Sequence, residues 1–178
     1  MPQDLKIGEE QDNVGEDGYF GAAIASTYED DAAMFDPTVV DPAVDFLVGL
    51  AGDGRALEFG IGTGRIALPL ANREIRVHGI EMSNAMVAKL RAKPGSADIG
   101  VSIGDFSTTS VGGSFAVAYL VFNTISNLTT QAAQVACFRN AAAHLDQVGC
   151  FVIELFVPRL QWLPPGETKL AFHVDESH

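Results

Sequence analysis

The stretch ALEFGIGTGR, residues 56–65, places three glycines directly after a short apolar run that ends in a carboxylate. The segment Ala56–Phe59 is typical of a buried strand, and Thr63–Ala71 has the pattern of a helix that Pro69 shortens or bends. Glycines at such a turn allow positive φ angles and let a ligand approach the backbone closely. The stretch therefore predicts a ligand site at a strand–helix turn or, without a ligand, only a tight turn.

Strand and helix patterns alternate along the rest of the chain. We expect further strands at the apolar segments Val77–Ile80, Ile99–Ile103, Ser114–Val121 and Cys150–Val157. We expect helices over Ile24–Phe35, from Asp41-Pro42 to Gly49 or Gly52, from Ser83 to Arg91, and over Thr130–Leu145. Continuously apolar strands separated by helices predict an α/β fold with a doubly wound, mostly parallel sheet.

Composition and charge narrow the class of protein. The chain has 178 residues, 23 acidic against 11 basic, and a net charge of −12. This charge repels nucleic acid and favours a cationic ligand. We expect a mobile acidic arm over residues 1–18 and one domain over 19–178. With no signal peptide and no apolar run long enough for a bilayer, we expect a cytoplasmic protein that binds no membrane.

Two classes of cofactor fit the glycine stretch. Gly62, Gly64 and Ala67 match the fingerprint of dinucleotide-binding proteins, which favours an NAD(P)-dependent oxidoreductase. That match leaves Glu58 unexplained. A carboxylate at the end of the first strand can accept hydrogen bonds from N–H groups of the loop. Its negative charge suits a cationic cofactor better than a pyrophosphate.

The sequence EFGIGTG closely resembles the E/D-x-G-x-G-x-G motif of class I S-adenosylmethionine-dependent methyltransferases. The resemblance covers about residues 20–160, and continues through Val77–Met86, Gly104–Phe106, Phe115–Leu128 and Val148–Val157. It implies a Rossmann-like methyltransferase sheet, S-adenosylmethionine as the cofactor and methyl transfer to a small molecule.

The resemblance also implies roles for individual residues. Glu81 would bind both ribose hydroxyls, Met82 would pack on the adenine, Asp105 would meet the adenine amino group, and Phe106 would lie beside the ring. The spacing of Glu81 from the glycines would equally serve a dinucleotide, and Asp105 is also typical of a residue that caps a loop. The predicted cofactor-binding residues are Tyr28, Glu58, Gly60, Gly62, Gly64, Arg65, Glu81, Met82, Asp105, Phe106 and Phe122.

Within the family, the chain resembles small-molecule methyltransferases, including N-methyltransferases of amino sugars. Thr27-Tyr28-Glu29 is similar to their T-Y-D segment, and Asn127 stands where they have a histidine. Asparagine can orient an acceptor but cannot take up a proton at neutral pH. We therefore expect Tyr28 and Asn127 to position the substrate. The alternatives are a core tyrosine for Tyr28 and helix capping for Asn123 and Asn127.

The remaining features concern the C-terminal part. Glu154 is a candidate buried acid near the end of the fifth strand, the Trp162 loop is either a lid or an ordinary connection, and Lys169–Val174 looks strand-like. The similar enzymes have two further strands. We expect either a sheet truncated after the fifth strand or an edge completed by a partner chain in a homodimer. A truncated sheet would leave a non-catalytic nucleoside-binding module as an alternative. No spacing of ligand residues predicts a metal site.

Overall fold

The computed structural model describes residues 17–157 and 165–166. Its centre is a five-stranded sheet in the order β3-β2-β1-β4-β5, and every neighbouring pair is parallel. The strands are β1 (Arg55–Phe59), β2 (Arg76–Glu81), β3 (Gly100–Ile103), β4 (Phe115–Leu120) and β5 (Leu145–Ile153). The strand order reverses between β1 and β4, which is the point where open α/β sheets bind their ligands. The predicted doubly wound parallel sheet is confirmed.

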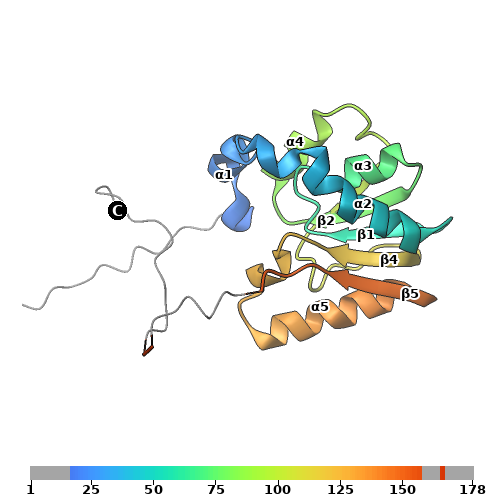
Figure 1. Ribbon diagram of the computed structural model, residues 1–178. Coiled ribbons are helices and arrows are strands. Elements are labelled where there is room, and N and C mark those ends of the chain that lie inside the picture. Colours follow the sequence, from blue (N-terminus) through green and yellow to red (C-terminus); the bar gives the residue numbers. More distant parts are fainter. Residues whose placement is uncertain (1–16, 158–164, 167–178) are drawn as a thin grey trace, which may run out of the picture.

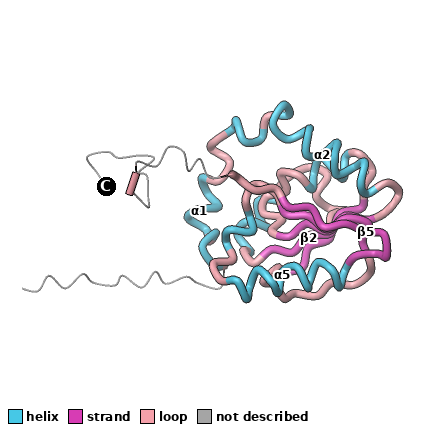
Figure 2. Tube along the Cα trace, turned by 60° about the horizontal axis from the view of Figure 1, so that its bottom comes forward, coloured by secondary structure: helices cyan, strands magenta, loops and turns pink. Residues whose placement is uncertain are grey.

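Helices cover both faces of the sheet (Figures 1 and 2). One face packs against α2 (Pro37–Ala51), α3 (Ala67–Asn72) and α4 (Asn84–Arg91), and the other packs against α5 (Gln131–His144). Figure 1 shows α1 (Ala22–Thr27) beyond the carboxyl ends of the strands. The single-turn helices are η1 (Gly18–Phe20), η2 (Ala32–Phe35) and η3 (Thr124–Asn127).

Successive residues of the central strands enter opposite cores. On β1, Ala56 belongs to the core under α2, whereas Leu57 and Phe59 belong to the core under α5. This period of two follows from the pleat of a strand, and both sets are apolar because both faces are covered. The alternation leaves Glu58 on the α2 side, directly opposite Tyr119 of β4.

Several predicted boundaries are wrong. The region Ile24–Phe35 is divided into α1 and η2, and α3 begins at Ala67 because the glycine loop extends to Ile66. The strand predicted at Cys150–Val157 begins at Leu145 and ends at Ile153. The apolar run continues past its end through three exposed residues, Leu155, Phe156 and Val157. Apolar patterning alone therefore did not locate the end of β5.

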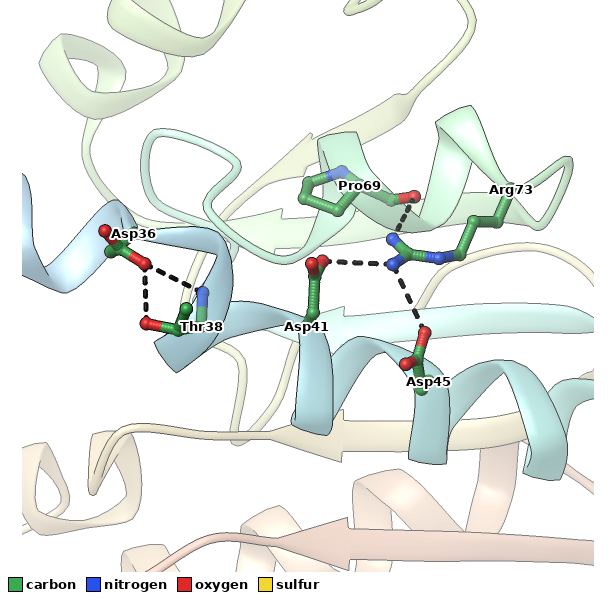
Figure 3. Close-up of polar contacts among 6 residues, drawn as sticks. All are labelled: Asp36, Thr38, Asp41, Asp45, Pro69 and Arg73. Carbon is green, nitrogen blue, oxygen red and sulfur yellow. Dashed lines mark hydrogen bonds and ion pairs between the residues drawn. The ribbon is translucent and has the colours of Figure 1, made fainter.

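The predicted start of α2 at Asp41 is also wrong. Asp36 is the cap, since its carboxylate accepts a hydrogen bond from the Thr38 N–H at 2.8 Å. Pro42 lies inside the helix, which forgoes the N–H that this position would donate. Asp41 instead pairs with Arg73, the C-cap residue of α3, at 3.0 Å, as Figure 3 shows.

Some predictions concern residues that the structure does not describe. Residues 1–16 of the predicted arm, the Trp162 loop and Lys169–Val174 all lie outside the described residues. Across residues 17–157 and 165–166, no helix combines the length and apolar character needed to cross a membrane.

Candidate functional site

The glycine loop follows β1 at the reversal of the strand order. Gly60, Gly62 and Gly64 have φ angles of 73°, 53° and 82°, which residues other than glycine rarely adopt. The Gly60 N–H donates to the Ile80 carbonyl at 2.9 Å, so the loop is attached to β2. A Cβ at Gly60 would lie 2.9 Å from Cγ2 of Thr124. The loop therefore needs glycine for its conformation and, at Gly60, for space.

Glu81, at the end of β2, holds this loop. Its Oε2 accepts a hydrogen bond from the Gly62 N–H at 2.8 Å, and its Oε1 accepts one from the Ser83 N–H at 3.0 Å. The side chain is buried, and burial raises its pKa, although the N–H groups of Ser83 and Gly62 oppose the shift. The expectation that Glu58 receives the glycine N–H groups is wrong for Gly62, because Glu81 lies on the neighbouring strand within reach of the loop.

Glu58 makes a different contact. It is 4% exposed, and its Oε2 accepts a hydrogen bond from the Tyr119 hydroxyl at 2.9 Å. Burial raises the pKa of Glu58 to about 8, against the opposing effects of the Tyr119 hydrogen bond and the Arg65 charge. Burial and the neighbouring carboxyl also raise the pKa of Tyr119. At neutral pH Glu58 is therefore mostly protonated, and a cation placed beside it would favour its ionised form.

Two cavities adjoin the glycine loop. The larger has a volume of about 560 Å³ and is lined by eight of the predicted residues, Tyr28, Gly60, Gly62, Glu81, Met82, Asp105, Phe106 and Asn127. The smaller has a volume of about 30 Å³ and is lined by six of them, Tyr28, Glu58, Gly60, Gly62, Arg65 and Phe122. The third glycine, Gly64, lines neither cavity and lies against Leu90 and Leu68. The structure thus brings together every predicted site residue except Gly64.

The loop after β3 forms one wall of the larger cavity. Asp105 caps a turn, because its carboxylate accepts the Ser107 N–H at 2.7 Å, and it also lines the cavity. The Phe106 ring is stacked 6.0 Å from the Phe59 ring. Asn140 of α5 donates a hydrogen bond to the Phe106 carbonyl at 2.8 Å, which anchors the loop to the helix that covers the second face of the sheet.

An aromatic segment before α2 forms another wall. The Tyr28 ring lies edge-on between those of Phe20 and Phe35, at centroid distances of 6.1 and 6.5 Å. Ser83 donates its hydroxyl hydrogen to the Phe20 carbonyl at 2.6 Å, which attaches the segment to the start of α4. Sequence reasoning missed four lining residues here, namely Asp17, Gly18, Tyr19 and Phe20. Their acidic, glycine-containing surroundings had no periodic pattern to distinguish them from the predicted arm.

Lys93 links the aromatic segment around Tyr28 to the glycine loop. Its ammonium group pairs with Glu29, the residue after Tyr28, and donates a hydrogen bond to the Thr63 carbonyl at 2.8 Å. The side chain of Tyr28 is partly buried and borders both cavities. The alternative of an ordinary core tyrosine is therefore less favoured than a position over the site.

Arg65 is the cation of the smaller cavity. Its guanidinium carbon lies 3.3 Å from the centroid of the Phe122 ring. Its Nη1 is buried, and no hydrogen-bond acceptor for it occurs within the described part of the chain. Burial lowers the pKa of Arg65, and the charges of Tyr28, Glu58 and Glu154 oppose that shift. Since buried N–H groups are nearly always paired, this cavity suits an anionic group.

The candidates after β4 and β5 differ in exposure. Asn127, the last residue of η3, is exposed at the rim of the larger cavity. Asn123 occupies the N-cap position of η3 but makes no capping hydrogen bond with its side chain. The interpretation of Glu154 as a buried acid is wrong. It follows the last residue of β5, where the chain leaves the sheet, and is exposed.

An α/β sheet with a nucleoside-sized cavity at its strand-order reversal defines a class of cofactor-binding proteins. The family model described as a methyltransferase domain matches residues 56–149, which is more than half of the chain. The chain therefore belongs to the methyltransferase domain family. No curated protein gives a significant sequence match.

Several solved structures have a similar fold. The CcbJ methyltransferase from Streptomyces caelestis is 35% identical with a TM-score of 0.68, over 75% of this chain and 56% of that one. DesVI from Streptomyces venezuelae is 21% identical with a TM-score of 0.63, over 81% of this chain and 60% of that one. The glycopeptide N-methyltransferase MtfA, complexed with S-adenosylmethionine, is 21% identical with a TM-score of 0.57, over 64% of this chain and 53% of that one. The chain thus spans little more than half the length of these enzymes.

Proposed function

We propose that the chain transfers a methyl group from S-adenosylmethionine to a small-molecule acceptor. The observation that carries the proposal is the pair of adjoining cavities at the glycine loop, one lined by Glu81 and the other by Arg65. Membership of the methyltransferase family and the 35% identity to CcbJ support it. When bound, the cofactor supplies a methyl group on a positively charged sulfur, which is open to direct displacement by a nucleophile.

The residues present fit this cofactor. A cavity of about 560 Å³ lies in the range typical of small-ligand sites, and Glu81 and Asp105 offer carboxylate oxygens to ribose hydroxyls and an amino group. The smaller cavity has a volume of about 30 Å³, enough for about two water molecules or for the two oxygens of a carboxylate. Arg65 lines this cavity, and its buried Nη1 has no hydrogen-bond acceptor among the residues that the structure describes. We infer that adenosine occupies the larger cavity and that the amino-acid end of the cofactor extends towards Arg65.

The chain's own groups would then position and shield the reactants. Tyr28 and Thr124 border both cavities, so they lie where the two ends of the cofactor join. The aromatic segment around Tyr28 would exclude water from that point. Asn127 would orient the acceptor from the rim of the larger cavity. Direct displacement needs alignment rather than a protein nucleophile, and no such residue is invoked.

The oxidoreductase alternative is less favoured. A dinucleotide would place its pyrophosphate at the glycine loop, close to the Glu81 carboxylate that accepts the Gly62 N–H there. Gly64, the second glycine of that fingerprint, packs against Leu90 and Leu68 instead of a cavity. Calorimetric titration with S-adenosylhomocysteine and, separately, NADH tests the choice. We expect binding of S-adenosylhomocysteine, and binding of NADH alone would reject the proposal.

A nucleoside-binding module without catalytic activity is the second candidate, because the larger cavity by itself would account for nucleoside binding. Incubation with S-adenosylmethionine carrying a labelled methyl group, over a panel of small amines, phenols and carboxylates, separates the two. Label transfer to an acceptor supports the enzyme. Cofactor binding with no transfer to any member of the panel would favour the module.

We further propose a cytoplasmic protein that forms a homodimer and does not bind nucleic acid. The net charge of −12 opposes contact with phosphate backbones. Among the described strands β5 lies at an edge of the sheet, and Val148 on it is 96% exposed. Unpaired edges of this kind favour strand pairing with another chain. Sedimentation equilibrium tests the dimer, and a monomer at all concentrations would contradict it.

A further inference from the structure

The turn after β4 has an unusual backbone. Phe122 and Asn123, which are adjacent and are not glycines, have positive φ angles of 55° and 62°. Left-handed backbone is uncommon for such residues, above all for a bulky one such as phenylalanine. It persists only where the surrounding structure holds it, and such positions cluster at functional sites.

Glu154, the first residue after β5, holds this turn through three hydrogen bonds. Its N–H donates to the Leu120 carbonyl at 3.1 Å, and its own carbonyl accepts the Asn123 N–H at 3.2 Å. Its side-chain Oε2 accepts the Phe122 N–H at 3.0 Å. Because two of the three bonds are made by the backbone, a side-chain substitution removes only the third and leaves the junction of β4 and β5 in place.

The turn after β4 also places the side chain that contacts Arg65, the cation of the smaller cavity. The guanidinium carbon of Arg65 lies 3.3 Å from the centroid of the Phe122 ring, close enough for a cation–π contact between the two side chains. Both residues line the smaller cavity, whereas Glu154 lines neither of the two cavities. Glu154 can therefore act on the site only through Phe122 or through its charge.

We propose that Glu154 is a positioning residue that holds Phe122 in its left-handed conformation and thereby orients Arg65 towards the carboxylate of the cofactor. The inference rests on the proposed function, since it assumes that the amino-acid end of the cofactor reaches Arg65. It predicts that Glu154 matters for ligands that carry this carboxylate and not for the nucleoside part alone. It also predicts that a hydrogen-bond acceptor at position 154, rather than a charge, is required.

Calorimetric titration of Glu154→Ala and Glu154→Gln with two ligands tests the proposal. S-adenosylhomocysteine has the amino-acid end, and 5′-methylthioadenosine has the same nucleoside and thioether without it. We expect Glu154→Ala to weaken binding of S-adenosylhomocysteine about tenfold, for one lost hydrogen bond, and to leave binding of methylthioadenosine unchanged. Glu154→Gln keeps an acceptor oxygen and should restore the affinity. Asp146→Ala, which removes an exposed carboxylate at the other end of β5, is the matched control and should change neither affinity.

Three results would overturn the proposal: an equal loss for both ligands, no loss for S-adenosylhomocysteine, or a Gln variant as weak as the Ala variant. If the unmodified chain binds neither ligand, the proposed function fails and the inference fails with it, and this is seen before any variant is made. Circular dichroism establishes that each variant is folded. Should Glu154→Ala not fold, Phe122→Leu removes the ring while keeping Glu154, and the same selective loss for S-adenosylhomocysteine is expected. Equal binding of both ligands by Phe122→Leu and the unmodified chain would then contradict the proposal.

Discussion

Substituting Glu81 by glutamine tests both roles that the structure gives this residue. The carboxylate accepts N–H groups from Gly62 at 2.8 Å and Ser83 at 3.0 Å, and it is 8% exposed, so water cannot readily replace it. Glutamine can accept one of these N–H groups, but its amide NH₂ then faces the other. Losing one buried hydrogen bond to a charged group costs about 2 kcal/mol, which lowers Tm by about 4–8 °C for a chain of this size.

The same substitution should weaken cofactor binding. If the Glu81 carboxylate binds the ribose hydroxyls, the loss of one charge-assisted hydrogen bond costs about 1.5–3 kcal/mol, or about 10- to 150-fold in Kd for S-adenosylhomocysteine. Thermal unfolding and calorimetric titration measure the two effects. Glu74→Gln, an exposed glutamate just before β2, is the matched control and should change neither. An unchanged Kd in Glu81→Gln would refute the role in ribose binding, and an unchanged Tm would refute the role in holding the loop.

Three further substitutions test the energetics of the fold. The pKa of Glu58 is raised to about 8 from its ordinary 4.5. The folded chain therefore retains a proton that the unfolded chain releases, and its free energy of unfolding should fall between these pH values by at most about 1.4 kcal/mol per unit. Urea unfolding at pH 5.5 and 7.5 measures this change, and the free energy of unfolding of Glu58→Gln should lack it. If the free energy of Glu58→Gln falls with pH as steeply as that of the unmodified chain, the raised pKa of Glu58 is contradicted. Gly79→Ala places a Cβ 2.7 Å from Cγ2 of Ile61 and should cost about 1–3 kcal/mol, so an unchanged Tm would contradict the packing. Arg73→Ala removes the partly exposed ion pairs of Figure 3. The free energy of unfolding, measured in urea, should change by less than about 1 kcal/mol, and a loss of several kcal/mol would contradict the minor role of these pairs.

Sequence patterns were sufficient for the class of the sheet, and all but one of the residues that they propose for the site line two adjoining cavities. Four apolar segments, most of them separated by helices, together with the strand before the glycine stretch, identify the parallel strands. A sheet covered on both faces needs strands that are apolar on both faces. Glu81 was proposed from the resemblance to methyltransferases and from its spacing after the glycines, and the structure places it at the end of β2 beside the glycine loop.

The contacts of individual acids required the three-dimensional structure. Glu58 is the next-to-last residue of β1 and Glu81 is the last residue of the neighbouring strand β2. Only the strand register shows that Glu58 faces Tyr119 while Glu81 reaches Gly62. Asp36 and Asp41 each precede a proline, and the choice between cap and ion pair depends on Arg73, which is distant in sequence. The contacts of Glu154 with the turn after β4 likewise depend on the pairing of β4 with β5. No local pattern contains these relations.

A crystal structure of the chain with bound S-adenosylhomocysteine would show whether Glu81 and Arg65 hold the two ends of the ligand. We expect adenosine in the larger cavity, with both ribose hydroxyls within hydrogen-bonding distance of the Glu81 carboxylate, and the ligand carboxylate against Arg65. A ligand bound elsewhere, or one in the same cavity with Glu81 and Arg65 out of contact, would contradict this expectation.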